Sequence, residues 1–385
     1  MITTLAVSGY RSLRDLVVPL GRLTVITGAN GSGKTSLYRA LRLLAETAQG
    51  RLVATLAAEG GLSSALWAGP ETVSRAVRAG ERPVQGTVRK GPVSLRLGFG
   101  GDAFGFAVDL GMPSREHPFP LDPAIKVEAM WNGERLGRLS VFAERRGPSV
   151  RLRGVRNGAW REVTERLSPF DSMVTHCAEP GDGAELLTLR ERMRDWRFYD
   201  ALRTDPDAPA RRPQMMTFTP VLGGDGADLA AAIATVAAIG DAAALEEAVE
   251  HAFPGSRLEV GGDVAGPGGL RLHQHGLLRP LGLAELSDGT LRYLLLVAAL
   301  LSPRPPELMV LNEPEASLHP SLLPSLARLL ARASRRCQVV VVSHSEPLID
   351  ALREAGVIEE VRLEKSFGET GAPGVEAPGW DWPRR

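Results

Sequence analysis

One short segment near the N-terminus limits the fold of this chain more than any other: GANGSGKT, residues 28–35. It follows an apolar, β-branched run at 23–27 and precedes a stretch in which Leu37, Leu41 and Leu44 share one helical face. A strand, a glycine-rich turn and a helix in this order form the context in which G-x-x-x-x-G-K-[ST] binds phosphate. A chance glycine-rich turn is disfavoured because the whole motif matches in this context. The segment therefore predicts nucleotide binding and an α/β fold.

The residues of this segment have separate predicted roles. The glycines leave room for backbone N–H groups to surround phosphate, and the helix N-terminus adds partial positive charge. Lys34 would reach the β- and γ-phosphates as part of the catalytic set, and the Thr35 hydroxyl would bind Mg²⁺. A nucleotide with Mg²⁺ is therefore the predicted ligand, and the other residues of the segment predicted to contact the nucleotide are Gly28, Asn30, Gly31, Ser32, Gly33 and Ser36.

A second motif, LSDGT at 286–290, stands directly before a long apolar run with helical spacing. By itself it fits an ordinary helix start, with Ser287 as the N-cap. The same residues also suit an anion, because the Ser287 hydroxyl, the Gly289 N–H and the helix N-terminus converge on one point. Helix caps of this composition are common, so the phosphate interpretation depends on the motif that follows.

Two apolar runs further along the chain end in polar residues. Residues 308–311 are followed by Asn312 and Glu313, and residues 339–342 are followed by Ser343 and His344. Both runs fit buried strands, and ligands of open α/β sheets gather at the carboxyl ends of the strands. A single histidine after a strand is more often a capping or loop residue than a catalytic one. The order of the four motifs along the chain is what draws attention to His344.

Together the motifs resemble the RecF/OLD-like predicted ATPases, a branch of the ABC-type ATPases related to SMC proteins. The match runs from about Leu5 to about Leu363 and rests on GYRSLRDLVVPLGRLTVITGANGSGKTSL, WRFYDAL, GADLAAAIATV, LSDGTLRYL, LNEPEASLHPSLL and VVVSHSEPLID. The resemblance implies an α/β fold, an ABC-type P-loop ATPase head with a mixed central sheet, a flanking antiparallel β region and a helical lobe. It also implies an ATP-dependent homodimer in which each glycine-rich loop faces Ser287 and Gly289 of the other copy.

The resemblance also assigns site residues. Arg11 and Ser12 would lie beside the nucleotide, Glu313 would polarise the attacking water, and His344 would contact the γ-phosphate. Asn312 would be a second magnesium ligand, at a position where transporters and SMC proteins have aspartate. An amide oxygen can accept from a magnesium-bound water but brings no charge, which predicts weaker metal binding or slow hydrolysis.

Other residues near these motifs leave questions open. Glu315 is a nearby source of negative charge, although the intervening proline leaves its direction uncertain. His319 stands where transporters have an aspartate that makes contact across the dimer. The glutamine loop that links the lobes of related ATPases has only two candidates, Gln85 and Gln214, and neither lies in a motif.

The rest of the sequence fits a division into four segments. Residues 1–165 hold the glycine-rich loop and short alternating strands, 166–301 fit a helical lobe ending in LSDGT, 302–365 return to the nucleotide-binding lobe, and 366–385 form a Gly- and Pro-rich tail. No heptad pattern persists, so the long coiled coil of SMC proteins is not expected. The stretch after His344 is too short for the nuclease domain of OLD-type proteins, so any nuclease would be a separate protein.

The charge balance argues against an all-over basic surface, because 45 Lys and Arg match 45 Asp and Glu. Arginines still concentrate between 135 and 212. A solvated face of ion pairs is the favoured explanation, and the alternative is a DNA phosphate track formed by Arg145, Arg146, Arg151, Arg153 and Arg156. The HQH segment at 273–275 has no third ligand spaced to complete a metal site, so it is expected to be a surface strand.

Localisation and function follow as expectations. The chain has no apolar stretch long enough for a bilayer and no signal-peptide pattern, which predicts a cytoplasmic protein without membrane contact. Cys177 and Cys337 are expected to be reduced thiols. One candidate function is an ATP hydrolase that acts in DNA repair or maintenance or in anti-phage defence. The other is a slow or non-hydrolysing nucleotide-gated sensor that controls a separate nuclease or toxin.

Overall fold

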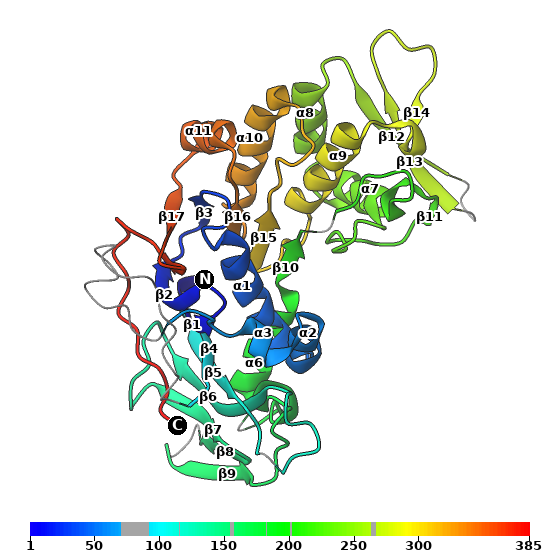
Figure 1. The fold of residues 1–385 in the computed structure, drawn as a ribbon. Coiled ribbons are helices and arrows are strands. Elements are labelled where there is room, and N and C mark those ends of the chain that lie inside the picture. Colours follow the sequence, from blue (N-terminus) through cyan, green and yellow to red (C-terminus); the bar gives the residue numbers. More distant parts are fainter. Residues whose placement is uncertain (71–91, 115, 155–157, 182, 201, 263–266) are drawn as a thin grey trace, which may run out of the picture. The chain divides into compact units, whose positions relative to one another are not determined.

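The computed structural model describes residues 1–385 apart from 71–91, 115, 155–157, 182, 201 and 263–266 (Figure 1). The chain divides into two compact units. The first unit comprises residues 1–21, 26–196 and 361–385, and the second comprises 22–25 and 197–360. The chain passes between them near the start of β3 (Leu23–Gly28), after α6 (Ala184–Asp195) and within β17 (Glu359–Ser366).

The first unit is built on an eight-stranded antiparallel sheet in the order β2-β1-β4-β5-β6-β7-β8-β9. Each strand from β4 to β9 pairs with the next one along the chain, so the alternating segments that the sequence predicted form one antiparallel region. The strands are β1 (Ile2–Tyr10), β2 (Leu13–Pro19), β4 (Leu95–Gly101), β5 (Phe104–Gly111), β6 (Ala124–Asn132), β7 (Val141–Arg146), β8 (Ser149–Arg153) and β9 (Trp160–Thr164).

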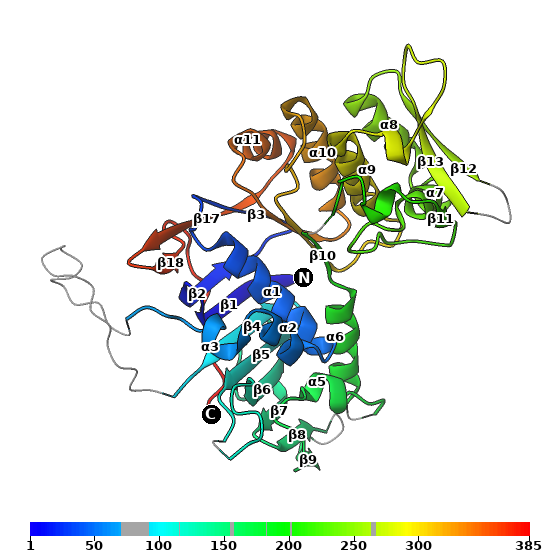
Figure 2. The same cartoon turned by 45° about the vertical axis from the view of Figure 1, so that its right-hand side comes forward.

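The helices of the first unit follow the glycine-rich loop and the antiparallel strands. Figures 1 and 2 both show α1 alongside α6, and α1 buries Leu37, Leu41 and Leu44 on the face that the sequence predicted. After β17 the chain turns into the antiparallel β18 (Glu369–Gly371), which lies within the predicted tail. The described helices are α1 (Lys34–Ala48), α2 (Leu52–Ala58), α3 (Gly61–Ala65), α5 (Met173–His176) and α6.

The second unit has a parallel core. Strands β10 (Arg197–Tyr199), β15 (Leu308–Asn312) and β16 (Gln338–Val342) pair in parallel, and β3 is the next strand beside β16, where Val339 N donates to the Arg22 carbonyl at 2.8 Å. Residues 309–311 and 339–341 are fully buried, as expected for parallel strands covered on both faces. Parallel strands here and antiparallel pairing of β17 with β18 confirm the predicted mixed sheet.

Helices and a small sheet complete the second unit. The predicted helical lobe also holds antiparallel strands, with β13 paired to β11, β12 and β14. His273 ends β13, so the HQH segment begins on a strand as expected. The elements are α7 (Leu229–Ile239), α8 (Ala242–Ala252), α9 (Asp288–Leu300), α10 (Leu323–Ala333), α11 (Glu346–Ala355), β11 (Gln214–Met215), β12 (Arg257–Gly262), β13 (Pro267–His273), β14 (Leu281–Gly282) and the 3₁₀ turns η1 (Pro209–Arg211), η2 (Leu283–Glu285) and η3 (Pro320–Leu322).

Helix α9, which begins at the LSDGT motif, is buried on all sides from Leu291 onward. Every residue from Leu291 to Leu300 is at most 7% exposed. Its apolar residues continue around the helix rather than forming a single stripe, which is the pattern of a helix enclosed by other elements. A charged residue in this helix, Arg292, is therefore forced into the core.

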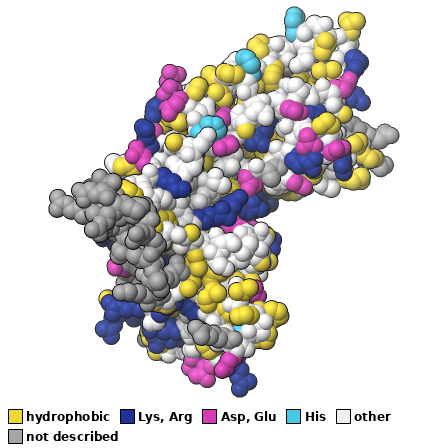
Figure 3. All heavy atoms as spheres, in the orientation of Figure 1, with side chains coloured by type: hydrophobic (Ala, Val, Ile, Leu, Met, Phe, Trp, Pro, Cys, Tyr) yellow, Lys and Arg dark blue, Asp and Glu magenta, His cyan; other side chains and the backbone are white. Residues whose placement is uncertain are grey.

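The surface and the thiols agree with the sequence analysis. On the face drawn in Figure 3, basic and acidic side chains are interspersed rather than gathered into one field. Cys177 and Cys337 are buried free thiols. Among the described residues, the helices are all too short or too polar to cross a membrane.

One prediction about the arginine-rich region is wrong. Arg145 is fully buried in the first unit and pairs with buried Glu128 at 3.2 Å, and its guanidinium donates to the Gly147 and Ser168 carbonyls, each at 2.7 Å. Strand alternation along β7 turns Arg145 inward, while its neighbours face the other side. It cannot contact DNA in this fold. Arg156 lies outside the described residues.

We expect Arg145→Ala to lower the free energy of unfolding by about 3–5 kcal/mol, because Glu128 would keep a buried charge without its partner. Urea denaturation followed by circular dichroism measures this. Arg146→Ala, at a side chain that is 56% exposed, is the matched control and should change stability by less than about 0.5 kcal/mol. Equal losses in the two variants would contradict the assignment of Arg145 to the core.

Candidate functional site

The glycine-rich loop lies in the first unit, between β3 and α1. Gly28, Gly31 and Gly33 have φ angles of 140°, 79° and 110°, a region that favours glycine. Space is also restricted. A Cβ on Gly28 would lie 2.3 Å from the Leu363 carbonyl oxygen, and one on Gly33 would lie 2.3 Å from Thr370 Oγ1. Gly28 and Gly33 are therefore required by both conformation and packing, and Gly31 by conformation alone.

Lys34 is buried and folds back over this loop. Its ammonium group donates to the carbonyl oxygens of Gly28 at 2.6 Å and Ala29 at 3.0 Å. Asn30, Gly31 and Thr35 are exposed, whereas Ser36 is half-buried. The loop thus combines an accessible backbone with a cation held beside it, an arrangement that suits a phosphate group.

Thr370 supports the loop from the C-terminal strand β18, and no sequence motif pointed to it. Its Oγ1 lies 2.7 Å from the Ser32 carbonyl oxygen and 2.8 Å from Ser12 Oγ, and its N–H donates to the Ser12 carbonyl at 2.8 Å. A hydroxyl has one proton and a carbonyl only accepts, so Thr370 donates to Ser32 and accepts from Ser12. Thr370 therefore brings Ser12, a predicted nucleotide neighbour, next to the loop.

Arg11 lies in the same β1–β2 turn but is held by another element. Its φ is 51°, and its guanidinium donates to Glu59, the C-cap residue of α2, at 2.8 Å. The Tyr10 hydroxyl donates to the same carboxylate at 2.7 Å, and burial together with Glu59 raises the pKa of Tyr10. Glu59 was not anticipated from the sequence, and it fixes the side chain of Arg11 in this structure.

In the second unit, Ser287 is the N-cap of α9. Its Oγ accepts from Thr290 N at 3.2 Å, so the ordinary capping role is realised, and the side chain remains exposed. A Cβ on Gly289 would lie 2.8 Å from the Ser317 carbonyl oxygen, which explains the glycine by close packing. The motif therefore presents an accessible hydroxyl at the N-terminus of a 13-residue helix.

Glu313 and His344, which follow the adjacent parallel strands β15 and β16, are neighbours. Glu313 has a φ of 48°, and its N–H donates to the Val342 carbonyl at 2.8 Å. Its Oε1 lies 3.3 Å from His344 Nδ1, and both side chains are about half exposed. Positive φ in a non-glycine residue costs about 1 kcal/mol or more and is found most often at functional sites.

Three residues behind Glu313 form a partly buried polar group. Ser343 Oγ donates to Glu315 Oε1 at 2.5 Å, and Arg292 donates to the Glu313 carbonyl oxygen at 3.3 Å. Burial lowers the pKa of Arg292, and the charge of Glu315 opposes that shift. Glu315 is therefore engaged with the serine that follows β16.

The remaining candidates have structural roles or lie outside the described residues. His319 caps η3 by accepting from Ser321 N at 3.2 Å, and Gln214 accepts from Ala230 N at the start of α7 at 3.2 Å. Gln85 falls within 71–91. Within the described part of the chain, His, Cys, Asp and Glu form no group of three that could hold a metal ion.

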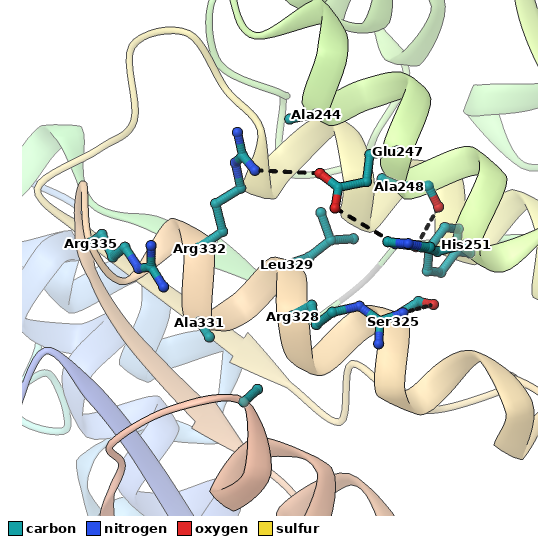
Figure 4. Close-up of a pocket in the computed structure, with 12 residues that line it drawn as sticks. Ala244, Glu247, Ala248, His251, Ser325, Arg328, Leu329, Ala331, Arg332 and Arg335 are labelled. Atoms are coloured by element: carbon teal, nitrogen blue, oxygen red, sulfur yellow. Dashed lines mark hydrogen bonds and ion pairs between the residues drawn. The ribbon is translucent and has the colours of Figure 1, made fainter.

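A separate pocket of about 220 Å³ lies between α8 and α10 of the second unit (Figure 4). Arg332 points toward Glu247 across it and also pairs with Asp241 at 2.5 Å. Arg328 donates to Ser325 at 3.0 Å. None of the predicted site residues lines this pocket.

Comparison with known proteins identifies both a family and a fold. Residues 23–351 match the family model described as "AAA domain, putative AbiEii toxin, Type IV TA system". Over 44 residues the chain is 48% identical to the OLD nuclease of Thermus scotoductus, a stretch that covers 11% of this chain and 8% of that protein.

Two solved structures have a similar fold. The SMC head bound to the C-terminal winged-helix domain of ScpA has a TM-score of 0.50 and 15% identity, covering 96% of this chain and 97% of that one. The SMC head with an extended coiled coil bound to the C-terminal domain of ScpA, from Pyrococcus furiosus, has a TM-score of 0.50 and 13% identity, covering 96% and 95%. The predicted fold class, an ABC-type head, is confirmed.

Replacing Thr370 with valine keeps its shape and removes its hydroxyl. We expect Thr370→Val to weaken binding of a fluorescent ATP analogue by roughly 5- to 10-fold, because bonds to Ser12 and Ser32, worth about 0.5–1.5 kcal/mol each, are lost. Thr370→Ser retains the hydroxyl and should bind within about twofold of wild type. Equal affinity in the valine and serine variants would show that the hydroxyl does not support the loop.

Proposed function

The chain belongs to this AAA-domain family, within the SMC/RecF/OLD branch of ABC-type ATPases, and on that premise we propose how it uses ATP. In this proposal two copies close around ATP, and hydrolysis to ADP and phosphate reopens them. The glycine-rich loop of one copy binds the triphosphate, and the exposed Ser287 and the Gly289 N–H of the other copy face its γ-phosphate. The observation that carries the proposal is the pairing of Glu313 with His344 at the end of β15.

The chemistry assigned to this pair is proton transfer and charge stabilisation. Glu313 accepts a proton from the water that attacks the γ-phosphorus, while the bond to the bridging oxygen breaks and ADP leaves. His344, 3.3 Å from the carboxylate, donates a hydrogen bond to the γ-phosphate and orients Glu313. Lys34 balances the charge of the β- and γ-phosphates.

Mg²⁺ fits the residues only as a companion of ATP. The two proposed ligands, the exposed Thr35 hydroxyl and Asn312, are neutral oxygen donors, and the described residues contain no cluster of His, Cys, Asp or Glu able to hold the ion alone. Mg²⁺ commonly keeps several waters and is bound by few protein groups together with substrate phosphates. When bound, the ion would neutralise charge on the phosphates.

Asn312 supports the alternative, a slow or non-hydrolysing sensor. The amide removes one negative charge from the place where a magnesium-bound water would be held, and Glu315 is occupied with Ser343. An ATP-bound dimer that persists could then recruit or restrain a separate effector. The family description names a toxin and the short sequence match is to a nuclease, so both classes are candidate effectors.

A role in DNA repair or anti-phage defence is part of the proposal. Without Arg145, the candidate DNA track consists of Arg146, Arg151, Arg153 and Arg156, the last of which lies outside the described residues. Arg151 forms an ion pair with Glu144 and lies over the Trp160 ring, 4.8 Å from its centroid. Arg153 donates to the Gly158 and Leu139 carbonyls at 3.0 and 2.8 Å. These contacts favour a solvated face of ion pairs, and DNA contact remains the second possibility to test.

Variants at 312 and 313 distinguish hydrolase from sensor. We expect Glu313→Gln to lower the rate of phosphate release by about 10²- to 10⁴-fold while ATP still binds, because a general base is removed. Asn312→Asp should raise the rate by roughly fivefold, since charge-assisted bonds are about twice as strong as neutral ones. Wild-type release as slow as that of Glu313→Gln would identify the sensor instead.

Charge reversal tests the DNA track. If it exists, Arg151→Glu combined with Arg153→Glu should weaken binding of a labelled duplex at least about tenfold and reduce the slope of log affinity against log salt by about 2. The control is Arg335→Glu with Arg336→Glu, two exposed arginines of the second unit. Unchanged binding in the first variant rejects the track.

A further inference from the structure

Two arginines of the second unit bind the same short piece of backbone. Arg292 Nη1 donates to the Leu202 carbonyl at 2.7 Å. Arg211 donates to the Thr204 carbonyl from Nη2 at 2.7 Å and from Nε at 3.0 Å, and to the Asp205 carbonyl at 3.1 Å. Residues 202–205 thus lie between two guanidinium groups.

The other side of each guanidinium reaches a different motif. Arg211 Nη1 donates to the Leu283 and Leu286 carbonyls at 2.9 and 2.8 Å, and its Nη2 donates to Asp288 at 2.8 Å. These contacts fix the loop that leads into Ser287. Arg292 Nη2 donates to the Glu313 carbonyl at 3.3 Å. A continuous chain of contacts therefore runs from the LSDGT loop through residues 202–205 to Glu313.

The burial of both side chains makes a passive role costly. Arg292 is 7% exposed, and the Arg211 side chain is 8% exposed. Arg292 forms no ion pair with any residue the structure describes, and its Nε is buried without a hydrogen-bond partner there. Among the described side chains, no carboxylate is hydrogen-bonded to Arg292, and the charge of Glu315 offsets only part of the cost of burying the guanidinium. A leucine or methionine in α9 would avoid that cost. The guanidinium is the side chain that can bind two carbonyls in different directions.

The residue at the end of this chain needs such support. Glu313 has positive φ, so its peptide groups are turned away from the regular path of β15. Its carbonyl accepts from Ala316 N–H at 3.0 Å within the following turn and from Arg292 of α9 at 3.3 Å, and its N–H donates to the Val342 carbonyl. With both peptide groups fixed, the carboxylate is directed at His344. A shift of α9 or of residues 202–205 would therefore move the carbonyl and the carboxylate together.

We infer that Arg292 is a positioning residue for Glu313, that Arg211 is a positioning residue for the LSDGT loop, and that residues 202–205 couple the two. ATP bound to the loop by the second copy would thereby set the orientation of Glu313 in the copy that carries the loop. This inference rests on the proposed function. It assigns to the chain an internal relay between the dimer contact and the reacting carboxylate.

Hydrogen exchange measured by mass spectrometry tests the relay without hydrolysis. The variants are Arg211→Gln and Arg292→Gln, with Arg211→Lys and Arg292→Lys as conservative replacements and Arg328→Gln, an exposed arginine of α10, as control. We expect Arg211→Gln to speed exchange at 283–288, which it contacts, and also at 312–316. We expect Arg292→Gln to speed exchange at 312–316, which it contacts, and also at 283–288. Faster exchange confined to the segment that each arginine touches overturns the relay.

Turnover gives the second readout. Arg292→Gln should lower kcat roughly 10- to 100-fold with KM for ATP within about twofold, because the Glu313 carbonyl would keep only its local bond from Ala316 N–H and lose its link to α9, which misplaces Glu313 without touching the glycine-rich loop. Arg292→Lys should recover part of this loss. In the double variant Arg211→Gln/Arg292→Gln, the fold-loss of kcat should be at least about threefold smaller than the product of the fold-losses in the two single variants.

Different results would overturn the proposed hydrolysis and the relay. A wild type no faster than Glu313→Gln overturns the proposed hydrolysis, and the exchange data still decide whether 202–205 couples the two loops. The relay is overturned, and the proposed function is left intact, if wild type hydrolyses ATP and the kcat effects of the two single variants simply multiply in the double variant. The same conclusion follows if KM rises and stability falls in parallel with kcat. No effect on exchange or turnover is expected for Arg328→Gln.

Discussion

The carbonyl of Glu313 is the point on which the geometry of the second unit depends. A residue with positive φ at the end of a buried strand exposes peptide groups that the strand no longer pairs. Ala316 N–H and Arg292, from inside α9, both donate to the carbonyl, and Val342 of the neighbouring strand accepts from the N–H. The contact between Glu313 and His344, the direction of the following loop and the packing of Ser317 against Gly289 are all consistent with this fixed turn.

The first unit stabilises its own strained turn from a distant part of the sequence. The glycine-rich loop has no room for a side chain at Gly28 or Gly33, because β17 and β18 pack directly against it. Thr370 adds hydrogen bonds to the loop and to Ser12. The segment that follows is also attached to the antiparallel sheet: Arg385 binds buried Asp109 at 2.7 Å, and Trp380 packs edge-on against Trp131.

Buried and exposed polar groups differ in how many partners hold them. Arg145 with Glu128, and Arg292 with its carbonyls, are buried and have several partners each, so they fix the backbone. The side chains of His344 and Glu313 are 50% and 43% exposed, Ser287 is also exposed, and all three have fewer partners. Buried cations that hold the backbone beneath accessible polar side chains form the arrangement expected of a site whose ligand arrives from outside. The neutral Asn312 fits a site in which ATP brings most of the charge.

The sequence alone determined the local features. The glycine-rich loop, the buried strands ending at Asn312 and Val342, and helix α9 each depend on residues close together in the chain, so spacing and apolar pattern were sufficient. The tertiary structure decided the rest, because side-chain direction and long-range contact are not written in local pattern. It placed Arg145 in the core, brought Thr370 to a loop more than 300 residues earlier, and joined Arg211 and Arg292 to one backbone segment. Hydrogen bonds to carbonyls leave no motif, since every residue has a carbonyl to offer.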